Sequence, residues 1–383
     1  MSTATSPSPV AAPTLESLAT PPAATTSLRK SHANNFDFLR IFLACLVVVS
    51  HSFVLSQGTE ENEPMRRLTP QLITFGSIAV NGFFIISGFL ITQSWEASVG
   101  VLDYFVKRIA RIYPAFIVAC IVGLFIIPKL SIGTWWNEGS PSPKMAVFDV
   151  LRLRGVWNVK ALPDNPFPFI TNGSLWTISY EFLCYVGVAI LGLLTLLRRR
   201  GVLLTLFAAS LVLTYLYDSQ TLTWEWKKPW TFFGTITIWA RFAPMYLAGM
   251  VFYVFRDRIP LNLPLAIVAA ALLAGVAFVP HTWCVALPTL GAYLIFWFAF
   301  CPAIRLHRTA AWGDFSYGVY LFSFPLQQLI VTWFGGRIHW STLLAISLPG
   351  SILVAALSWH LVERWPLDWA KRWAKRRRLA KAA

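Results

Sequence analysis

Apolar residues in this chain gather into long runs, and short polar or basic segments separate one run from the next. A run of about 20 apolar residues is long enough to cross a bilayer as a helix. A helix also satisfies all of its own backbone hydrogen bonds inside lipid. The pattern therefore predicts an all-α, polytopic membrane protein with about ten transmembrane helices. The predicted spans are residues 36–53, 71–95, 113–128, 173–197, 202–217, 232–255, 263–279, 283–301, 315–334 and 342–361.

Three regions of the chain differ in composition. Residues 1–35 are rich in Ser, Thr, Pro and Ala and hold no apolar run, which predicts a disordered cytoplasmic tail rather than a signal peptide. The predicted transmembrane domain covers 36–363, and its longest loop, 129–172, separates the third and fourth spans. Loops of this length are often functional. Residues 364–383 are strongly basic, and we expect them to form a second cytoplasmic tail.

The composition supports a membrane protein and argues against a nucleic-acid partner. The chain has 383 residues, of which 56% are hydrophobic and only 13% charged, and soluble domains carry about 25% charged residues. The net charge of +15 would suggest nucleic acid in a soluble protein. Most of this excess lies in short loops and in the last 20 residues, where topology and anionic lipid explain it better. The five cysteines all lie in apolar runs without metal-ligand spacing, so we predict neither a metal site nor a disulfide framework.

The placement of Lys and Arg predicts the orientation. With the N-terminus in the cytoplasm, 20 Lys and Arg residues fall in segments on the cytoplasmic side and 10 fall on the outer side. Basic residues are in excess in the cytoplasmic loops of membrane proteins. Both termini are therefore predicted to be cytoplasmic, and the 129–172 loop is predicted to lie outside.

The first predicted helix carries two ionisable residues, Arg40 near one end and His51 near the other. Eleven positions separate them, so both project from one face of the helix, about 16 Å apart along its axis. Ionisable groups within a membrane segment are costly and usually face a protein interior or a water-filled cavity. The alternative is that Arg40 reaches to the lipid headgroups and that His51 is an ordinary packing residue.

Glu181 and Arg241 are predicted to lie at about the same depth in the membrane as His51, counting 1.5 Å per helical residue. A buried Glu and a buried Arg in one layer could form an ion pair. The functional alternative is that Glu181 orients or polarises His51, as carboxylates commonly do for catalytic imidazoles. The sequence leaves both possibilities open.

Two further groups of residues are candidates for ligand binding. Arg108 and Arg111 share a helix face, and with Arg40 and Lys107 they could form a cationic cluster for a phosphate-rich ligand. The alternative is that this basic segment only marks the cytoplasmic side. The segment 83–89, FFIISGF, places Ser87 and Gly88 within a span, where small residues allow close helix packing or the approach of a ligand. Ser87 lacks the G-x-S-x-G surroundings of a nucleophile elbow.

Five short blocks follow one another along the chain: Arg40 with His51; Phe83, Phe84, Ser87, Gly88 and Phe89; Arg108 and Arg111 with Pro114; Leu175, Trp176, Thr177 and Glu181; and the segment 316–326, SYGVYLFSFPL. Together, across about 36–365, they resemble the acyltransferase 3 family of membrane-bound O-acyltransferases. Its members are similar in build to enzymes that acetylate lipopolysaccharide O-antigens, exopolysaccharides and Nod factors. Many members have His at the position of Ser323, so no role is assigned to that residue.

The resemblance implies a ten-helix enzyme of the bacterial inner membrane that transfers an acyl group, with acetyl-CoA as donor substrate and a carbohydrate hydroxyl as acceptor. It implies that Arg40, Arg108 and Arg111 hold the CoA phosphates at the cytoplasmic mouth. His51 would then act as general base, with Glu181 assisting, and an acyl group passed first to a protein group is an open alternative. We expect Ser87, Trp176 and Arg241 to line the substrate channel.

Two other classes of protein would share many of these features. A transporter or flippase would also have ten spans and intramembrane charge, but we see no inverted repeat in the sequence. A non-catalytic membrane scaffold would leave the pairing of Arg40 with His51 unexplained. The 129–172 loop, with Trp135 and Trp136, is our candidate for an outward platform that binds sugar. The sequence does not define the acceptor glycan, the acyl group or the oligomeric state.

Overall fold

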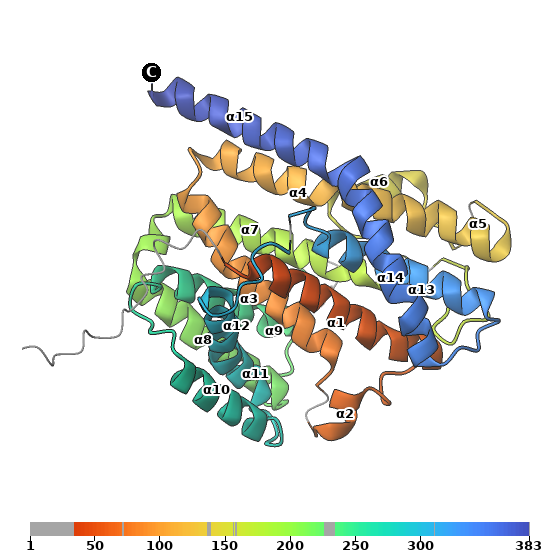
Figure 1. Ribbon diagram of the computed structural model, residues 1–383, viewed down its shortest axis with the longest axis horizontal. Coiled ribbons are helices and arrows are strands. Elements are labelled where there is room, and N and C mark those ends of the chain that lie inside the picture. The colour runs from red at the N-terminus through yellow and green to blue at the C-terminus, as the bar shows by residue number, and fades with distance from the viewer. Residues whose placement is uncertain are drawn as a thin grey trace, which may run out of the picture.

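The computed structural model describes residues 34–382, apart from 71–72, 136–138, 156, 158, 226–233 and 310. Helices form the framework of the described part of the chain, which confirms the all-α prediction (Figure 1). They are α1 (Phe36–Gln57), α2 (Pro64–Leu68), α3 (Phe75–Glu96), α4 (Val101–Ile121), α5 (Ile127–Ile132), α6 (Pro143–Leu151), α7 (Ile178–Leu193), α8 (Arg200–Asp218), α9 (Ile236–Val254), α10 (Leu263–Val276), α11 (Trp283–Ala286), α12 (Ala292–Phe300), α13 (Ser316–Trp333), α14 (Trp340–Ser358) and α15 (Arg364–Ala382). The predicted tail 1–35 lies outside the described residues, except for its last two positions.

Seven helical stretches among the described residues are long and apolar enough to cross a membrane, so the chain is a multi-pass membrane protein. They are Phe36–Gln57, Phe75–Glu96, Val101–Ile132, Gly173–Leu193, Arg200–Asp218, Trp283–Phe300 and Trp340–Ala380. Three other predicted spans also form helices, α9, α10 and α13. Of these, α10 has 14 residues and is shorter than a full crossing. The predicted number of ten spans therefore remains a prediction.

Two basic segments of the predicted cytoplasmic side are helical, and one of them, 364–382, was expected to be a tail. The basic stretch 107–111 lies within a continuous helical stretch, Val101–Ile132, that includes Pro114. Its first half is amphipathic, with Tyr104 and Ile112 buried, and that apolar stripe gives it a face to pack on the bundle. The basic segment 364–382 continues from α14 through a π-helical turn, Trp359–Glu363, as α15. This helix runs along α4 at the top of the view (Figure 1).

The centre of the bundle is made by α1, α3, α9 and α13: α9 packs on α3, α3 on α1, and α1 on α13. α13 contains a fully buried polar residue, Gln327. Its amide donates to the carbonyl of Val48 at 3.0 Å and to Ser52 Oγ at 2.8 Å. Both of these partners lie on α1. Polar residues inside a membrane bundle are stable when they are bonded in this way, so α13 is held by its neighbours rather than by hydropathy alone.

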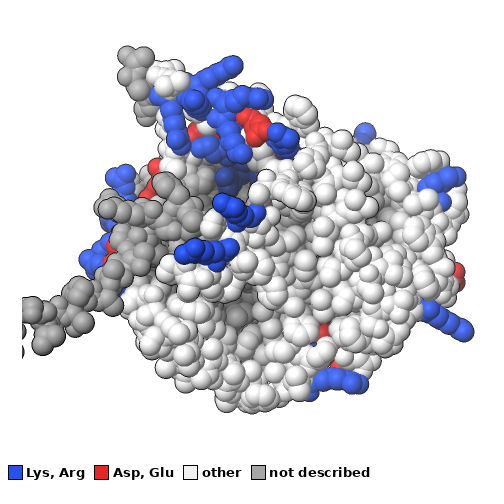
Figure 2. Space-filling view, in the orientation of Figure 1, with Lys and Arg blue, Asp and Glu red and all other residues white. Residues whose placement is uncertain are grey.

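Basic residues gather at one end of the molecule. Figure 2 shows Lys and Arg concentrated over the region of α15 and α4, with few charged side chains over most of the same face. The start of α1 lies against the segment after α12, because Asn35 donates to the carbonyl of Ile304 at 3.0 Å and accepts from the Leu306 backbone at 2.9 Å. This arrangement agrees with the predicted cytoplasmic side for these segments, and the orientation itself stays a prediction.

The small residue in the FFIISGF segment serves helix packing. A Cβ added at Gly88 would overlap the carbonyl oxygen of Tyr246, and one at Gly249 would overlap the carbonyl of Ile85. The backbones of α3 and α9 therefore touch at this crossing, which is one of the two uses expected for a small residue at position 88.

We expect Gly88→Ala to lower the stability of the purified protein in detergent by about 3 kcal/mol, because the two backbones have no room for a methyl group. The matched control is Gly187→Ala in α7, where a Cβ would meet nothing within 4 Å. That change should be neutral or stabilise by about 1 kcal/mol through helix propensity. Thermal unfolding curves of both variants test this, and equal melting temperatures would show that α3 and α9 do not cross here.

Candidate functional site

A cavity of about 500 Å³ opens between α1, α3, α4, α7, α13 and α15. The polarity of its lining residues differs from one end of the cavity to the other. Basic and acidic side chains gather where α4 and α15 run together, and aromatic and apolar side chains line the part further along α3 and α13. Its lining residues include Arg40, Phe83, Ser87, Lys107, Arg108, Arg111, Thr177, Glu181, Tyr185, Asp314, Tyr320 and Lys371.

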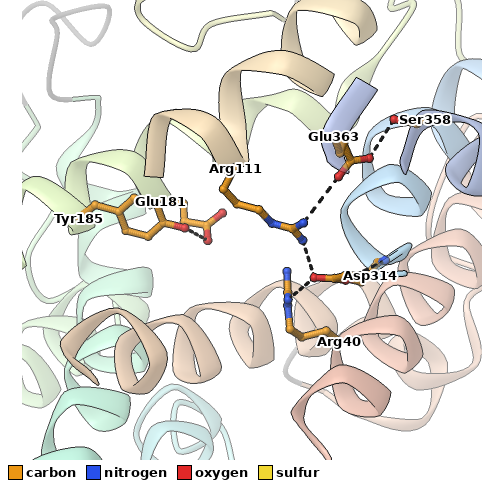
Figure 3. A network of polar contacts seen from close by, with 8 residues as sticks. Arg40, Arg111, Glu181, Tyr185, Asp314, Ser358 and Glu363 are labelled. Carbon is orange, nitrogen blue, oxygen red and sulfur yellow. Dashed lines mark hydrogen bonds and ion pairs between the residues drawn. The ribbon is translucent and has the colours of Figure 1, made fainter. Parts of the chain in front are cut away.

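Asp314, in the segment between α12 and α13, is the centre of the charged end (Figure 3). Its Oδ2 lies 2.5 Å from Arg40 Nη1 and 2.7 Å from Arg111 Nη2. Its Oδ1 accepts from Ser316 Oγ at 2.6 Å. Burial alone would raise the pKa of Asp314, but the guanidinium groups of Arg111 and Arg40 hold it well below its usual value. Asp314 therefore stays ionised and joins α1 to α4.

Arg111 has a second carboxylate partner. Its Nη1 lies 3.6 Å from Oε2 of Glu363, whose other oxygen accepts from Ser358 Oγ at 2.9 Å (Figure 3). Glu363 is 1% exposed, so the arginine is matched by buried negative charge on two sides. Arg40 and Arg111 are thus parts of an ion-pair network rather than the free cations that the sequence suggested.

The other two expected cations differ from each other. Lys107 pairs at 2.8 Å with Asp103, which is fully buried. Arg108 lies over the ring of Tyr185, with its Cζ 5.9 Å from the ring centroid. The buried Nε of Arg108 has no hydrogen-bond partner in the part of the chain that the structure describes. Among the four predicted cations, Arg108 is the one whose charge faces the cavity without a carboxylate partner in that same part of the chain.

Glu181 lies further along the cavity, in the first turn of α7. Its Oε1 accepts from the Tyr185 hydroxyl at 2.6 Å and from Ser87 Oγ at 3.2 Å. Arg241 instead donates its Nε to Asn81 at 3.3 Å. The possible Glu181–Arg241 ion pair is therefore wrong for the described structure. Glu181 contacts α3 at Ser87, whereas Arg241 contacts the same helix at Asn81, about 9 Å away along its axis.

His51 lies beyond the cavity. Its ring packs edge-on against Phe324 of α13, with centroids 5.1 Å apart, and its buried Nδ1 has no hydrogen-bond partner among the described residues. The cavity reaches Tyr320 on α13, which is one helical turn, or about 6 Å, before Phe324. No hydrogen bond joins His51 to Glu181 in the described structure, so the expected contact between them is absent.

Tyr320, Phe83 and Thr177 line the cavity, and Tyr320 lies one helical turn from the ring that contacts His51. The hydroxyl groups of Thr177 and Tyr320 share a hydrogen bond of 2.5 Å, and the ring of Phe83 lies 5.9 Å from that of Tyr320. Arg40 and His51 share one face of the unbroken helix α1, as predicted, but Arg40 lines the cavity and His51 is not among its lining residues.

The predicted outer loop covers the His51 end of the bundle. Phe167 packs 6.3 Å from Phe324, the same ring that contacts His51. Asn165 donates to the backbone and side chain of Gln328 on α13, at 2.9 and 2.7 Å. The loop is thus anchored beside His51. Trp135, expected in a sugar platform, is 55% exposed, and Trp136 lies outside the described residues.

Five of the eight residues nominated from the sequence line the cavity: Arg40, Ser87, Arg108, Arg111 and Glu181. His51, Trp176 and Arg241 do not. The ring of Trp176 stacks on that of Phe242 at 5.6 Å, next to Thr177, which does line the cavity. The sequence reasoning missed Asp314, Glu363 and Tyr185. Asp314 carried a signal, because an acidic residue in a chain with only 17 of them stands directly before a predicted span.

The fold and this site define a multi-pass membrane protein with a buried, charge-lined cavity, and the comparisons with known proteins define its class as an acyltransferase. The family described as an acyltransferase domain matches residues 34–362, so the chain belongs to the acyltransferase 3 family. It is 29% identical over 351 residues to an O-acetyl transferase of Shigella phage Sf6, covering 87% of this chain and 95% of that protein. It is 26% identical over 354 residues to Nodulation protein 10 of Rhizobium leguminosarum bv. viciae, covering 87% and 93%. The acyltransferase MdmB of Streptomyces mycarofaciens is 29% identical over 153 residues. No solved structure matches the chain.

Proposed function

We propose that this protein transfers an acyl group, most simply acetyl, from cytoplasmic acyl-CoA to a hydroxyl of a surface or secreted carbohydrate at the bacterial inner membrane. The observation that carries the proposal is the cavity that leads from the basic end of the molecule along α3 and α13 to Tyr320, one helical turn from the ring that contacts His51. The family assigns acyl transfer, and the name of the phage relative specifies an O-acetyl group. The family match also argues against the transporter and scaffold alternatives.

The donor would enter from the basic end. Arg108 lines the cavity and has no carboxylate partner among the described residues, so its guanidinium group can bind a phosphate. The apolar walls beyond it, including Ile86 and Leu90, suit a thioester arm. In its extended form that arm is on the order of the 16 Å that α1 rises between Arg40 and His51. The length of the arm thus matches the distance that the acyl group must cover.

His51 is proposed as the general base. The acceptor hydroxyl gives its proton to a ring nitrogen of His51 while its oxygen attacks the thioester carbonyl. The carbon–sulfur bond then breaks, and the leaving CoA sulfur takes up the proton. The Nδ1 of His51 has no hydrogen-bond partner among the described residues, which supports this role, because such a nitrogen keeps its lone pair or its proton available.

Glu181 is proposed to act on the donor arm rather than on His51. The hydrogen bonds from Ser87 and Tyr185 fix its carboxylate inside the cavity, where it can accept an amide N–H of the arm. Ser87, which contacts Glu181, is also the candidate for the alternative route in which the acyl group passes first to the protein. On either route the acyl group passes Tyr320, so transfer requires the Thr177–Tyr320 hydrogen bond to open.

The experiment that tests this function combines a deletion strain with the purified protein. Mass spectrometry of the cell-surface and secreted glycans should show one that loses an acyl ester when the gene is deleted and regains it on complementation. The full-length protein in detergent should release free CoA thiol from acetyl-CoA in the presence of that glycan. A strain with an unchanged glycan ester profile, together with purified protein that neither binds nor turns over acetyl-CoA, would overturn the proposal.

A further inference from the structure

The last helix, α15, forms part of the cavity. It continues from α14 without a break in the helical backbone and lies along α4 (Figure 1). Ala370 is fully buried and Ala374 is 5% exposed, so these small residues bring α15 close to its neighbours. Arg378, near the far end, donates to the carbonyl of Ala97 in the turn between α3 and α4. The helix is therefore held at both ends against the bundle.

One face of α15 looks into the cavity. Leu367, Ala370 and Lys371 are all lining residues, and their spacing of three and four positions puts them on one side of the helix. Lys371 is 73% exposed, which places it at the mouth rather than deep inside. Its only ion-pair partner among the described residues is Asp368 on the same helix, at 3.5 Å. Such exposed pairs are weak, so the ammonium group is free to bind another anion.

The charge balance of the cavity gives Lys371 a role. Arg40 and Arg111 are matched by Asp314 and Glu363, and Lys107 is matched by Asp103. A donor that carries several phosphate charges must find its cations elsewhere. Two lining residues remain available in the described chain, Arg108 on α4 and Lys371 on α15. They come from two helices that pack on each other, so one polyphosphate could contact both.

We propose that Lys371, on the inner face of α15, binds a phosphate group of the acyl donor, and that α15 forms one wall of the donor site. This inference rests on the proposed function, because it takes acyl-CoA as the donor. The basic C-terminal segment then has a direct part in binding substrate, beyond its contribution to membrane topology.

The test measures donor affinity for the full-length protein in detergent by isothermal titration. The variant is Lys371→Ala, and the matched control is Arg376→Ala, an exposed residue about 140° around the same helix that does not line the cavity. The probes are acetyl-CoA and acetyl-pantetheine, which has the same thioester arm but no phosphate. Lys371→Ala should weaken acetyl-CoA binding about fivefold and leave acetyl-pantetheine binding unchanged, whereas Arg376→Ala should change neither. Lys371→Arg should retain the affinity.

The possible outcomes distinguish the role of Lys371 from the use of acyl-CoA as donor. A wild-type protein that binds no acetyl-CoA would refute the proposed donor. Wild-type binding that survives unchanged in Lys371→Ala, or that falls equally in Arg376→Ala, would overturn the role of Lys371 alone. Weakened binding of both acetyl-CoA and acetyl-pantetheine would show a disturbed fold of α15 rather than a lost phosphate contact, and would also count against the proposal.

Discussion

Replacing His51 with Ala or Gln is expected to lower acyl transfer to the acceptor by a factor of about 10² to 10⁴, the usual contribution of a general base. Binding of acetyl-CoA should change little, because His51 lies beyond the cavity and touches Phe324 rather than the charged end. Transfer is measured as ester formed on the acceptor, and donor affinity by titration. Gln keeps a hydrogen-bonding side chain but cannot take up a proton near neutral pH, so it should be as inactive as Ala.

The matched control for this prediction is His307→Ala, an exposed histidine in the segment between α12 and α13. It should leave transfer unchanged. Melting temperatures of the two His51 variants within a few degrees of the wild type would show that loss of activity is not loss of fold. Retention of acceptor acylation in both His51→Ala and His51→Gln would remove His51 from the mechanism.

Asp314→Asn is expected to destabilise the protein by about 3 to 5 kcal/mol, because it leaves Arg40 and Arg111 facing each other without their shared anion. The matched control is Asp218→Asn, which breaks the pair between Asp218 and His281. Those two side chains are 44% and 46% exposed, so the cost should be at most about 1 kcal/mol. Thermal unfolding in detergent measures both, and equal shifts would contradict the central place of Asp314 in the network.

The difference in stability between the wild type and Asp314→Asn should depend on pH, and the pKa of Asp314 fixes the direction. The pKa of Asp314 is lowered in the folded protein, since Arg111 and Arg40 outweigh the effect of burial. A carboxyl with a lowered pKa contributes its full stability above its unfolded pKa of about 3.9 and loses it as the pH falls through the folded value. The stability gap between wild type and Asp314→Asn should therefore stay constant from pH 8 to about pH 5 and shrink only in stronger acid.

Local patterns in the sequence predicted the elements of this fold well, because membrane helices are defined by apolar length within one segment. They also predicted that Arg40 and His51 share a face, which follows from helix geometry once α1 is unbroken. The helical state of the basic tail was not predicted, because a run such as 364–382 has the composition of a solvated segment. It forms α15, whose apolar face packs on α4.

Side-chain pairing could not be predicted in the same way. Depth counted along the helices predicted one layer for Glu181 and Arg241, but it does not fix the direction in which either side chain points. Glu181 accepts hydrogen bonds from Ser87 and Tyr185, and Arg241 donates to Asn81. The partners of Arg40 and Arg111 come from Asp314 and Glu363, more than 200 positions away in the sequence from either arginine. The packing of α13 on α1 and α4, and of the turn Trp359–Glu363 on α4, brings them together.

Acyl transfer through His51 requires a donor that enters beside α15 and brings its carbonyl to His51. The most direct measurement is a structure of the full-length protein with an acyl-CoA analogue in which a ketone replaces the thioester. We expect phosphate density beside Arg108 and Lys371, the arm along the cavity past Glu181, an open Thr177–Tyr320 contact, and the ketone next to the ring of His51. An analogue that binds outside this cavity, or one whose ketone stays on the Glu181 side of a closed Tyr320, would contradict transfer through His51.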